Sequence, residues 1–164
     1  MILLGIDPGT ARVGYGVVEK TQGRKSKDSL ACLDYGIIET ASTLPTPERL
    51  HIIHKELRSL IKKHRPDLMA VESVFFFKNL KTALPVSEAR GVVLLAAAQY
   101  KVAVCELTPL QAKMAVTGYG RAQKKQVQRM VQELLSLPEL PRPDDAADAL
   151  GLAIACTVLT NKSK

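Results

Sequence analysis

Short apolar runs and amphipathic stretches alternate along this chain of 164 residues. The first three runs have the composition of β-strands and cover residues 2–7, 13–19 and 31–39. A Pro-Gly-Thr turn separates the first two runs, and a polar, basic segment separates the second from the third. Because short links of this kind join neighbouring strands as hairpins, the pattern predicts three antiparallel strands.

The apolar spacing becomes helical between residues 45 and 64, and Pro66 then marks the end of the helix. The apolar positions that share one face of this helix are Leu50, Ile53, Leu57, Leu60 and Ile61. A continuously apolar strand is predicted at residues 68–72, a helix at residues 80–100, and a fifth strand at residues 102–107.

The last third of the chain is predicted to be helical. Thr108 can cap and Pro109 can open a helix that runs to a glycine-rich break at residues 118–120, and a second helix then extends to residue 137. Residues 141–144 open the final helix. The apolar residues through which this helix would pack on the sheet are Ala149, Leu152, Ala153, Cys156 and Leu159.

This order of elements predicts an α/β fold. Three meandering strands followed by alternating helices and strands form one mixed five-stranded sheet with helices on both faces. The chain contains no internal repeat and no long linker, and its length suits one core. We therefore expect residues 1–160 to form a single domain, followed by a short basic tail at residues 161–164.

The charge balance favours a polyanionic partner. Lys and Arg number 23 against 16 Asp and Glu, so the net charge is +7, and nucleic acid is the first candidate. The alternative is a basic protein that its charge keeps soluble. The longest apolar stretches, residues 91–98 and 149–159, are shorter than the ~20 residues that span a bilayer. The chain also begins with a strand instead of a leader, so we expect a cytoplasmic protein without a membrane segment.

The cysteines and histidines do not indicate a zinc site. The three cysteines, Cys32, Cys105 and Cys156, are far apart and flanked by apolar residues, as reduced core cysteines are. All three histidines lie in the helix predicted at residues 45–64, without the spacing that zinc ligands show.

Four acids lie where a carboxylate is costly. Asp7 and Glu72 end apolar strands, and Asp145 and Asp148 lie on the apolar final helix. If they converge, hard divalent cations would relieve their repulsion, and ligation by oxygen alone favours Mg²⁺, with Mn²⁺ as a substitute. Two such ions, ~3.5–4 Å apart, can hydrolyse a phosphodiester by activating water and stabilising the leaving oxygen.

Each acid also has an ordinary structural interpretation. Asp7 can begin a Pro-Gly turn, Glu72 can pair with a lysine, and acids in the first turn of a helix are usually capping or dipole partners. The spacing also leaves one choice open. Asp145 lies three residues before Asp148 and Asp144 lies four before it, and either separation places two carboxylates on one helical face.

Basic residues flank the glycine-rich break at residues 118–120. A glycine loop that opens a basic helix can approach phosphates closely, although a solvated helical face is the alternative. The basic residues concerned are Lys113, Arg121, Lys124 and Lys125. Phe75, Phe76 and Phe77 form a second candidate contact, because successive side chains of an extended segment alternate and at least one ring should be free to stack on a base. The other rings would pack in the core.

In combination these motifs resemble one known family. The motifs are Gly-Ile-Asp-Pro-Gly-Thr at residues 5–10, Gly-Tyr-Gly at 14–16 and again at 118–120, Val-Glu-Ser-Val-Phe at 71–75, and Asp-Ala-Ala-Asp-Ala-Leu at 145–150. Together they strongly resemble the RuvC family of Holliday junction resolvases, in the ribonuclease H-like superfamily. The resemblance covers nearly the whole chain. It implies a mixed five-stranded sheet and Mg²⁺-dependent, paired nicking of four-way DNA junctions by a homodimer.

The resemblance also implies roles for particular residues. It identifies the metal-binding catalytic acids as Asp7, Glu72, Asp145 and Asp148, and so selects Asp145 over Asp144. It places Lys113 and Lys124 near the scissile strand and Phe75 on a base at the junction centre, although Phe76 and Phe77 leave open which ring stacks. A branch-migration helicase is the partner that the family implies.

Other assignments compete with this resemblance. Residues 5–10 also resemble the phosphate loop of the actin, sugar kinase and heat-shock ATPase superfamily, but those folds need two such domains. A small YqgF-type relative acting on RNA shares the first motif only. For the homodimer, the helix predicted at residues 80–100 is the expected contact, since it has apolar area beyond one core stripe. The residues that offer this area are Val86, Arg90, Val93, Leu94 and Ala97.

Overall fold

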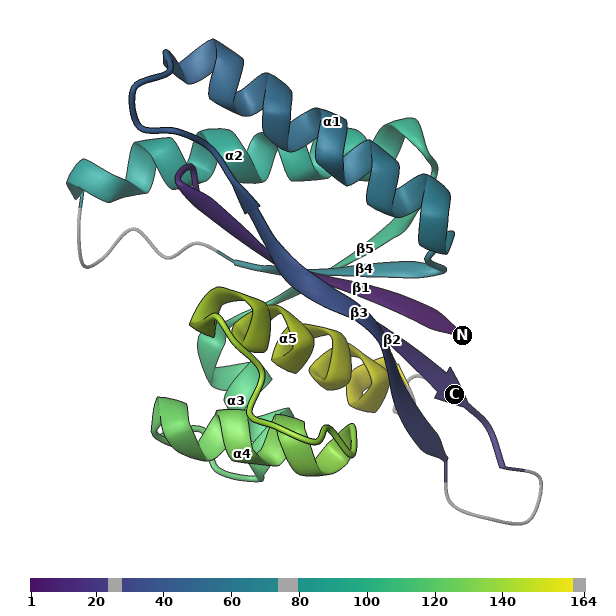
Figure 1. Ribbon diagram of the computed structural model, residues 1–164. Coiled ribbons are helices and arrows are strands. Elements are labelled where there is room, and N and C mark those ends of the chain that lie inside the picture. Colours follow the sequence, from purple (N-terminus) through teal and green to yellow (C-terminus); the bar gives the residue numbers. More distant parts are fainter. Residues whose placement is uncertain (24–27, 74–79, 161–164) are drawn as a thin grey trace.

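The computed structural model describes residues 1–23, 28–73 and 80–160. Within these ranges five strands form a single sheet in the order β3-β2-β1-β4-β5, and helices cover both of its faces (Figure 1). The strands are β1 (Ile2–Asp7), β2 (Arg12–Thr21), β3 (Ser29–Glu39), β4 (Leu68–Glu72) and β5 (Ala103–Leu107). The predicted basic tail at residues 161–164 lies outside the described residues.

The sheet is mixed, as predicted. β1 pairs with β2 and β2 pairs with β3 in antiparallel register, which confirms the two hairpins. β4 runs parallel to both β1 and β5. Strand β2 begins one residue before and ends two residues after its predicted limits, because its pairing with β3 continues from Arg12 to Thr21.

The helices are α1 (Thr46–His64), α2 (Leu80–Gln99), α3 (Pro109–Thr117), α4 (Lys124–Leu134) and α5 (Asp144–Thr160). Thr108 caps α3 as predicted, since its side chain accepts a hydrogen bond from the Gln111 backbone. The predicted end of α4 at residue 137 is wrong. The helix ends at Leu134 because Ser136 has a φ of 50°, which helical backbone cannot adopt, while the buried Leu135 prolongs the apolar pattern.

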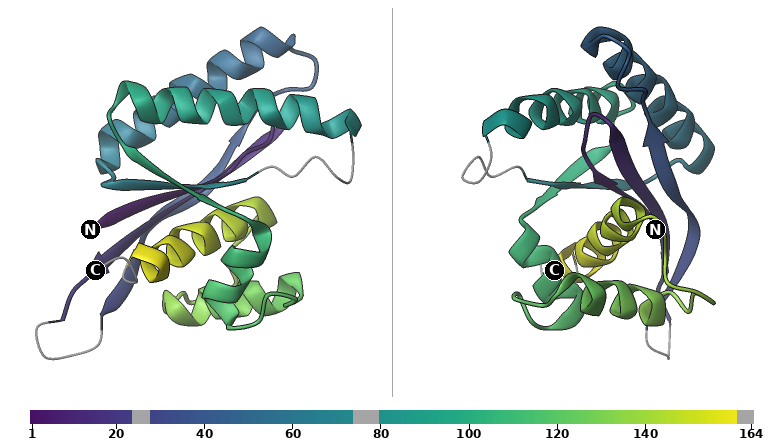
Figure 2. Two further views of the ribbon diagram at one scale, coloured as in Figure 1. Left: turned by 180° about the vertical axis from the view of Figure 1, so that it is seen from behind. Right: turned by 60° about the vertical axis from the view of Figure 1, so that its left-hand side comes forward.

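Two apolar cores lie on opposite faces of the sheet, because side chains alternate along each strand. Leu4 and Ile6 of β1 pack with α1 and α2 on one face, whereas Leu3 packs with α5 on the other. Figure 2 shows α1 and α2 together on the first face, and α5 lying between the sheet and the outer helices α3 and α4 on the second.

Helix α5 lies unusually close to β1 and β2 because glycines line its path. A Cβ atom on Gly14 would lie 2.0 Å from the Asp145 carbonyl oxygen, and one on Gly5 would lie 2.0 Å from the Ala149 carbonyl oxygen. A Cβ atom on Gly16 would meet Leu150 in the same way, at 2.7 Å from its backbone nitrogen. The Gly-Tyr-Gly motif of β2 therefore sets the distance at which the acidic end of α5 approaches the sheet.

The residues predicted to pack α5 on the sheet are buried, apart from Leu159, which is half-buried. The dimer surface expected on α2 needs correction. Val93 and Ala97 are fully buried beneath the helix, and Arg90 pairs with Glu106 on β5. Val93 and Ala97 are therefore wrongly predicted at an interface, because periodicity cannot tell which of two apolar stripes meets the sheet.

Cys156 is buried, Cys32 and Cys105 are partly exposed, and none of the three forms a disulfide bond. In the part of the chain that the structure describes, no helix is both long enough and apolar enough to span a membrane.

Candidate active site

The ends of two neighbouring parallel strands bring Asp7 and Glu72 to the same edge of the sheet. Ile6 of β1 is paired with Val71 of β4, and the two acids are the next residues on their strands. Along β1, Asp7 is an even number of residues from Leu3, and along β4, Glu72 is an even number of residues from Ala70. Both Leu3 and Ala70 pack in the core beneath α5. Since alternate side chains share a face, both carboxylates belong to the face that α5 covers.

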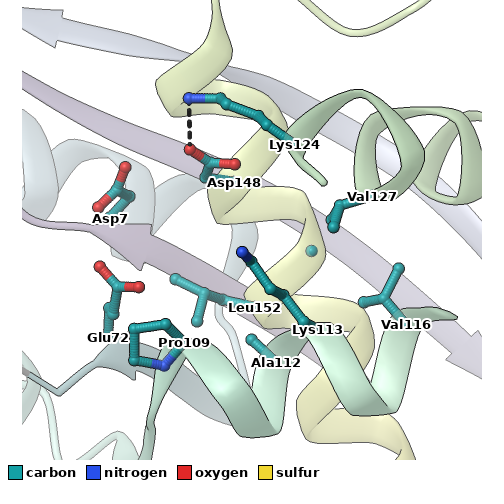
Figure 3. Close-up of a pocket in the computed structure, with 11 residues that line it drawn as sticks. Asp7, Glu72, Pro109, Ala112, Lys113, Val116, Lys124, Val127, Asp148 and Leu152 are labelled. Atoms are coloured by element: carbon teal, nitrogen blue, oxygen red, sulfur yellow. Dashed lines mark ion pairs between the residues drawn. The ribbon is translucent and has the colours of Figure 1, made fainter. Parts of the chain in front are cut away.

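Helix α5 contributes the third acid to this edge. Asp148 lies just over one turn into the helix, and the glycine contact beneath Asp145 holds that turn against β2. Asp7, Glu72 and Asp148 line a cavity of about 220 Å³ between the sheet, α3, α4 and α5. Figure 3 shows the three carboxylates pointing toward a common space. The structure thus brings together three acids that lie far apart in the sequence.

Two predicted lysines line the same cavity from the outer helices. Lys113 belongs to α3, and Lys124 is the first residue of α4 (Figure 3). The Lys124 ammonium lies 3.0 Å from the Asp148 carboxylate and 3.3 Å from that of Asp144. Burial alone would lower the pKa of Lys124, but hydrogen bonds to Asp148 and Asp144 raise it, so this lysine stays charged.

The carboxyl groups are electrostatically strained. Burial, followed by the charges of Glu72, Asp148 and Asp145, raises the pKa of Asp7 to about 8. Burial and the charge of Asp148 raise the pKa of Glu72, although Lys113 and Lys124 oppose this effect. Burial also raises the pKa of Asp148, against the effect of Lys124. The two lysines therefore compensate the acids only in part.

Asp145 and Asp144 differ in their surroundings. Asp145 does not line the cavity of the other three acids. It lies with Asp144 on an adjoining cavity of about 1010 Å³, yet its charge contributes to the raised pKa values of Asp7 and Asp148. Asp144 is exposed, and its pKa is lowered by hydrogen bonds from Gln128 and Lys124. Its carboxylate is already satisfied, whereas that of Asp145 has no hydrogen bond or ion pair within the described residues.

The remaining predicted contact residues are dispersed. Lys125 lines the larger cavity, and Arg121 is exposed in the turn before α4 without lining either cavity. Phe75, Phe76 and Phe77 lie outside the described residues. Sequence reasoning missed the apolar wall of the smaller cavity, formed chiefly by Pro109, Val116, Val127 and Leu152. It also missed Arg129, although the four-residue spacing from Lys125 indicates a shared helical face.

The donor set fits a hard cation in its chemistry. Every candidate ligand is a carboxylate oxygen, and burial, followed by repulsion from the neighbouring acids, raises the pKa of Asp7, an effect that a divalent cation would oppose. The carboxylates are nevertheless separated from one another in this arrangement. Among residues 1–23, 28–73 and 80–160, no three His, Cys, Asp or Glu side chains are close enough together to hold a metal ion as they lie.

The fold and the site define a class of protein before any relative is considered. An antiparallel three-stranded half continues into parallel strands, and acids at the ends of β1 and β4 face a helix. This is the ribonuclease H-like architecture, as predicted. The solved structure of Thermus thermophilus RuvC shares it with a TM-score of 0.90 and 35% identity, over 99% of this chain and 96% of that chain.

Comparison with known sequences is more specific. A family model described as crossover junction endodeoxyribonuclease RuvC matches residues 3–156. A protein of that name from Halothermothrix orenii is 54% identical over 154 residues, which cover 94% of this chain and 90% of the relative. Its namesake from Caldicellulosiruptor saccharolyticus is 48% identical over 163 residues, covering 99% and 95%. The chain belongs to the RuvC family of crossover junction endodeoxyribonucleases.

The structure of T. thermophilus RuvC in complex with Holliday junction substrate matches equally well, with a TM-score of 0.91 at 35% identity over 99% of this chain and 96% of that chain. The competing assignments to an actin or sugar kinase type of phosphate-binding domain, and to a YqgF-type relative, receive no support from these matches.

Proposed function

We propose that this protein is a Holliday junction resolvase, a structure-selective endonuclease that makes paired, symmetric nicks in four-way DNA junctions during recombination and repair. One observation carries the proposal: three acids from β1, β4 and α5 and two lysines from α3 and α4 line one cavity. Membership of the RuvC family and the likeness to a RuvC bound to its junction substrate support the same conclusion.

The acids would hold the metal. Asp7, Glu72 and Asp148 surround the cavity, and Asp145 lies close enough for its charge to affect Asp7. We infer two Mg²⁺ ions per active site, with Mn²⁺ as a substitute, because the donors are all carboxylate oxygens. When bound, such ions activate a water and stabilise the leaving oxygen of a phosphodiester.

The other residues of the cavity would position the DNA strand. Lys113 and Lys124 provide two ammonium groups for the non-bridging oxygens of the scissile phosphate. The apolar wall beside them limits the water around this phosphate, which strengthens each charge contact. Arg121 and Lys125 are exposed near the start of α4, and would contact neighbouring phosphates. Phe75 would stack on a base at the junction centre.

A homodimer is the assembly that this reaction requires. A four-way junction is symmetric, so two copies related by a two-fold axis place one active site on each of two strands. We further propose that the protein acts in the cytoplasm beside a branch-migration helicase, as the resemblance to the family implies. Each chain would contribute one domain, formed by residues 1–160.

The decisive experiment uses a synthetic four-way junction and a linear duplex of matching sequence, incubated with Mg²⁺ or with EDTA. We expect symmetric nicks in the junction only, and only with Mg²⁺. Asp7→Asn and Glu72→Gln should each slow cleavage by more than about a hundredfold, or ~3 kcal/mol of barrier, with junction binding retained. Asp34→Asn removes an acid that pairs with α1 and serves as the control. Cleavage without a divalent metal, or a fully active Asp7→Asn variant, would exclude this mechanism.

A further inference from the structure

The cavity of about 1010 Å³ beside the acidic site is a basic groove with a distinct composition. Its walls come from the start of β2, the first half of α4, and the segment that leads into α5. Lys124 lines both this groove and the acidic cavity, so the two spaces adjoin at its side chain. The cations of the groove are Arg12, Lys124, Lys125, Arg129 and Arg142, and its acids are Asp144 and Asp145.

Most of this positive charge is available to a ligand. Arg12 pairs with Glu39 at 3.0 Å, but both side chains are more than half exposed, and solvent weakens such a pair. In the described part of the chain, no carboxylate lies within ion-pair distance of Lys125, Arg129 or Arg142.

The acids of the groove oppose this charge only weakly. Asp144 already binds Lys124 at 3.3 Å and accepts a hydrogen bond from Gln128 at 2.8 Å, so its charge is largely neutralised. Asp145 is half-buried, whereas Lys125, Arg129 and Arg142 are exposed. A ligand that approaches from solvent therefore meets three arginine or lysine side chains before any free carboxylate.

We propose that this groove binds the phosphodiester backbone of the DNA strand next to the cut, through Arg12, Arg129 and Arg142 together with Lys125. The inference rests on the proposed function. A strand whose scissile phosphate lies in the acidic cavity must continue on both sides of it, and the groove is the adjoining space beyond Lys124. Guanidinium groups bind phosphate oxygens in pairs and read no base, so these contacts are independent of sequence.

The groove thus has a different task from the acidic cavity. Its cations hold and align the strand, whereas the acids act on one phosphate. Phosphate contacts of this kind release counterions, so each one steepens the salt dependence of binding by about 0.9 in a plot of log K against log salt concentration. This slope measures the groove directly, without any cleavage.

The test compares two double variants that each remove two positive charges. Arg129→Gln with Arg142→Gln alters the groove, and Arg58→Gln with Lys62→Gln alters exposed residues of α1, on the opposite face of the sheet. Binding to a synthetic four-way junction is titrated in EDTA at several NaCl concentrations. We expect the groove variant to lower the slope by about two and to weaken Kd roughly ten- to a hundredfold near 0.1 M salt. The control variant should match the wild type.

Equal slopes for the groove variant and the control variant would overturn the inference. The single variant Arg129→Gln, on a regular helix, should lower the slope by about one, and it replaces the double variant if thermal melting shows that the latter does not fold. The proposed function is tested separately by the wild type. If the wild type neither binds nor cuts the junction, the proposed function fails; if it does both and the slopes are equal, only the groove assignment fails.

Discussion

The two faces of the sheet are built from the same strands but have opposite electrostatics. On the side of α1 the acid Asp34 bonds Lys63 at 2.7 Å and His64 at 3.0 Å, and although burial alone would raise its pKa, these hydrogen bonds lower it. On the α5 side, Asp7 and Glu72 are half-buried near one another, and burial together with neighbouring acids raises their pKa values. The acid on the α1 side is stabilised by its partners, whereas the charges of the acids on the α5 side are compensated only in part.

The same contrast appears in the packing. The α1 side is filled by large aliphatic side chains such as Leu4, Met69 and Leu57, each fully buried. The α5 side carries glycines on β1 and β2, where the helix backbone approaches the strands directly. Both faces carry an apolar core, but only the α5 face also fixes the position of the proposed catalytic acids. Mutations on the two faces should therefore separate stability from activity.

The largest change in stability is expected on the α1 side. Leu57→Ala deletes a fully buried side chain and should cost about 2–5 kcal/mol of unfolding free energy. Cleavage per folded molecule at 25 °C should stay within about twofold, or ~0.4 kcal/mol of barrier, because Leu57 lies on the face of the sheet opposite the acids. Urea denaturation and single-turnover cleavage measure the two quantities. A loss of cleavage by the folded variant would show that the faces are coupled.

Gly14→Ala should affect both quantities. Its new methyl group would lie 2.0 Å from the Asp145 carbonyl oxygen, so α5 must move away from β2. We expect a loss of about 1–3 kcal/mol in stability, as for other overpacked sites, and at least a tenfold (~1.4 kcal/mol) loss of cleavage. Gly91→Ala on α2 is the matched control, since nothing lies within 4 Å of the added carbon. That control should be neutral or slightly stabilising; unchanged cleavage in Gly14→Ala would show that the contact does not position the acids.

Asp7→Asn should stabilise the metal-free protein at high pH. The pKa of Asp7 is about 8 in the folded state, above its unfolded value, so its contribution to stability is fully present below about pH 4 and is lost as the pH rises through about 8. Asparagine does not ionise, so the variant does not lose this stability as the pH rises. In EDTA at pH 9 we expect a gain of about 1 kcal/mol or more, which is ~2–4 °C in Tm, and a smaller gain at pH 6.

Asp34→Asn should change the stability in the opposite direction to Asp7→Asn. The folded-state pKa of Asp34 is lowered, so its contribution is present above its unfolded pKa and is lost as the pH falls through the folded value. Its replacement should lower Tm at pH 7 and have less effect near pH 3. Melting curves of both variants across this pH range provide the measurement. Shifts of the same sign at pH 9 would contradict the contrast between the two faces.

The smallest effect is expected at the boundary of the acidic site. Asp144 is exposed, and its ion pair with Lys124 should contribute no more than ~1 kcal/mol. Asp144→Asn should therefore change cleavage by less than about fivefold, whereas Asp145→Asn should lose far more, because Asp145 is a proposed metal ligand. Junction cleavage with Mg²⁺ compares the two. Equal losses would show that the acids of α5 are assigned in the wrong register.

Much of this fold follows from local sequence. The short apolar run in residues 2–7 and the helical spacing in residues 45–64 predict their elements correctly, because each pattern reflects which side chains a regular backbone can bury together. The predicted end of a helix is wrong where a residue is still buried although the backbone is no longer helical. Leu135 keeps the apolar spacing of α4, but Ser136 has already left the helical region. On α2 the apolar pattern likewise does not distinguish the buried Val93 and Ala97 from a free surface.

The sequence by itself determined the strand and helix order, the family, and the acids that carry the proposed chemistry, since motifs and periodicity are local properties of the chain. Only the tertiary structure decided that Asp7, Glu72 and Asp148 share one cavity, and that Asp145 lies on the next. It also decided that Arg12, Arg129 and Arg142 meet in one groove. Strand register, side-chain parity and the glycine-limited approach of α5 set these distances, and each depends on contacts between segments far apart in the sequence.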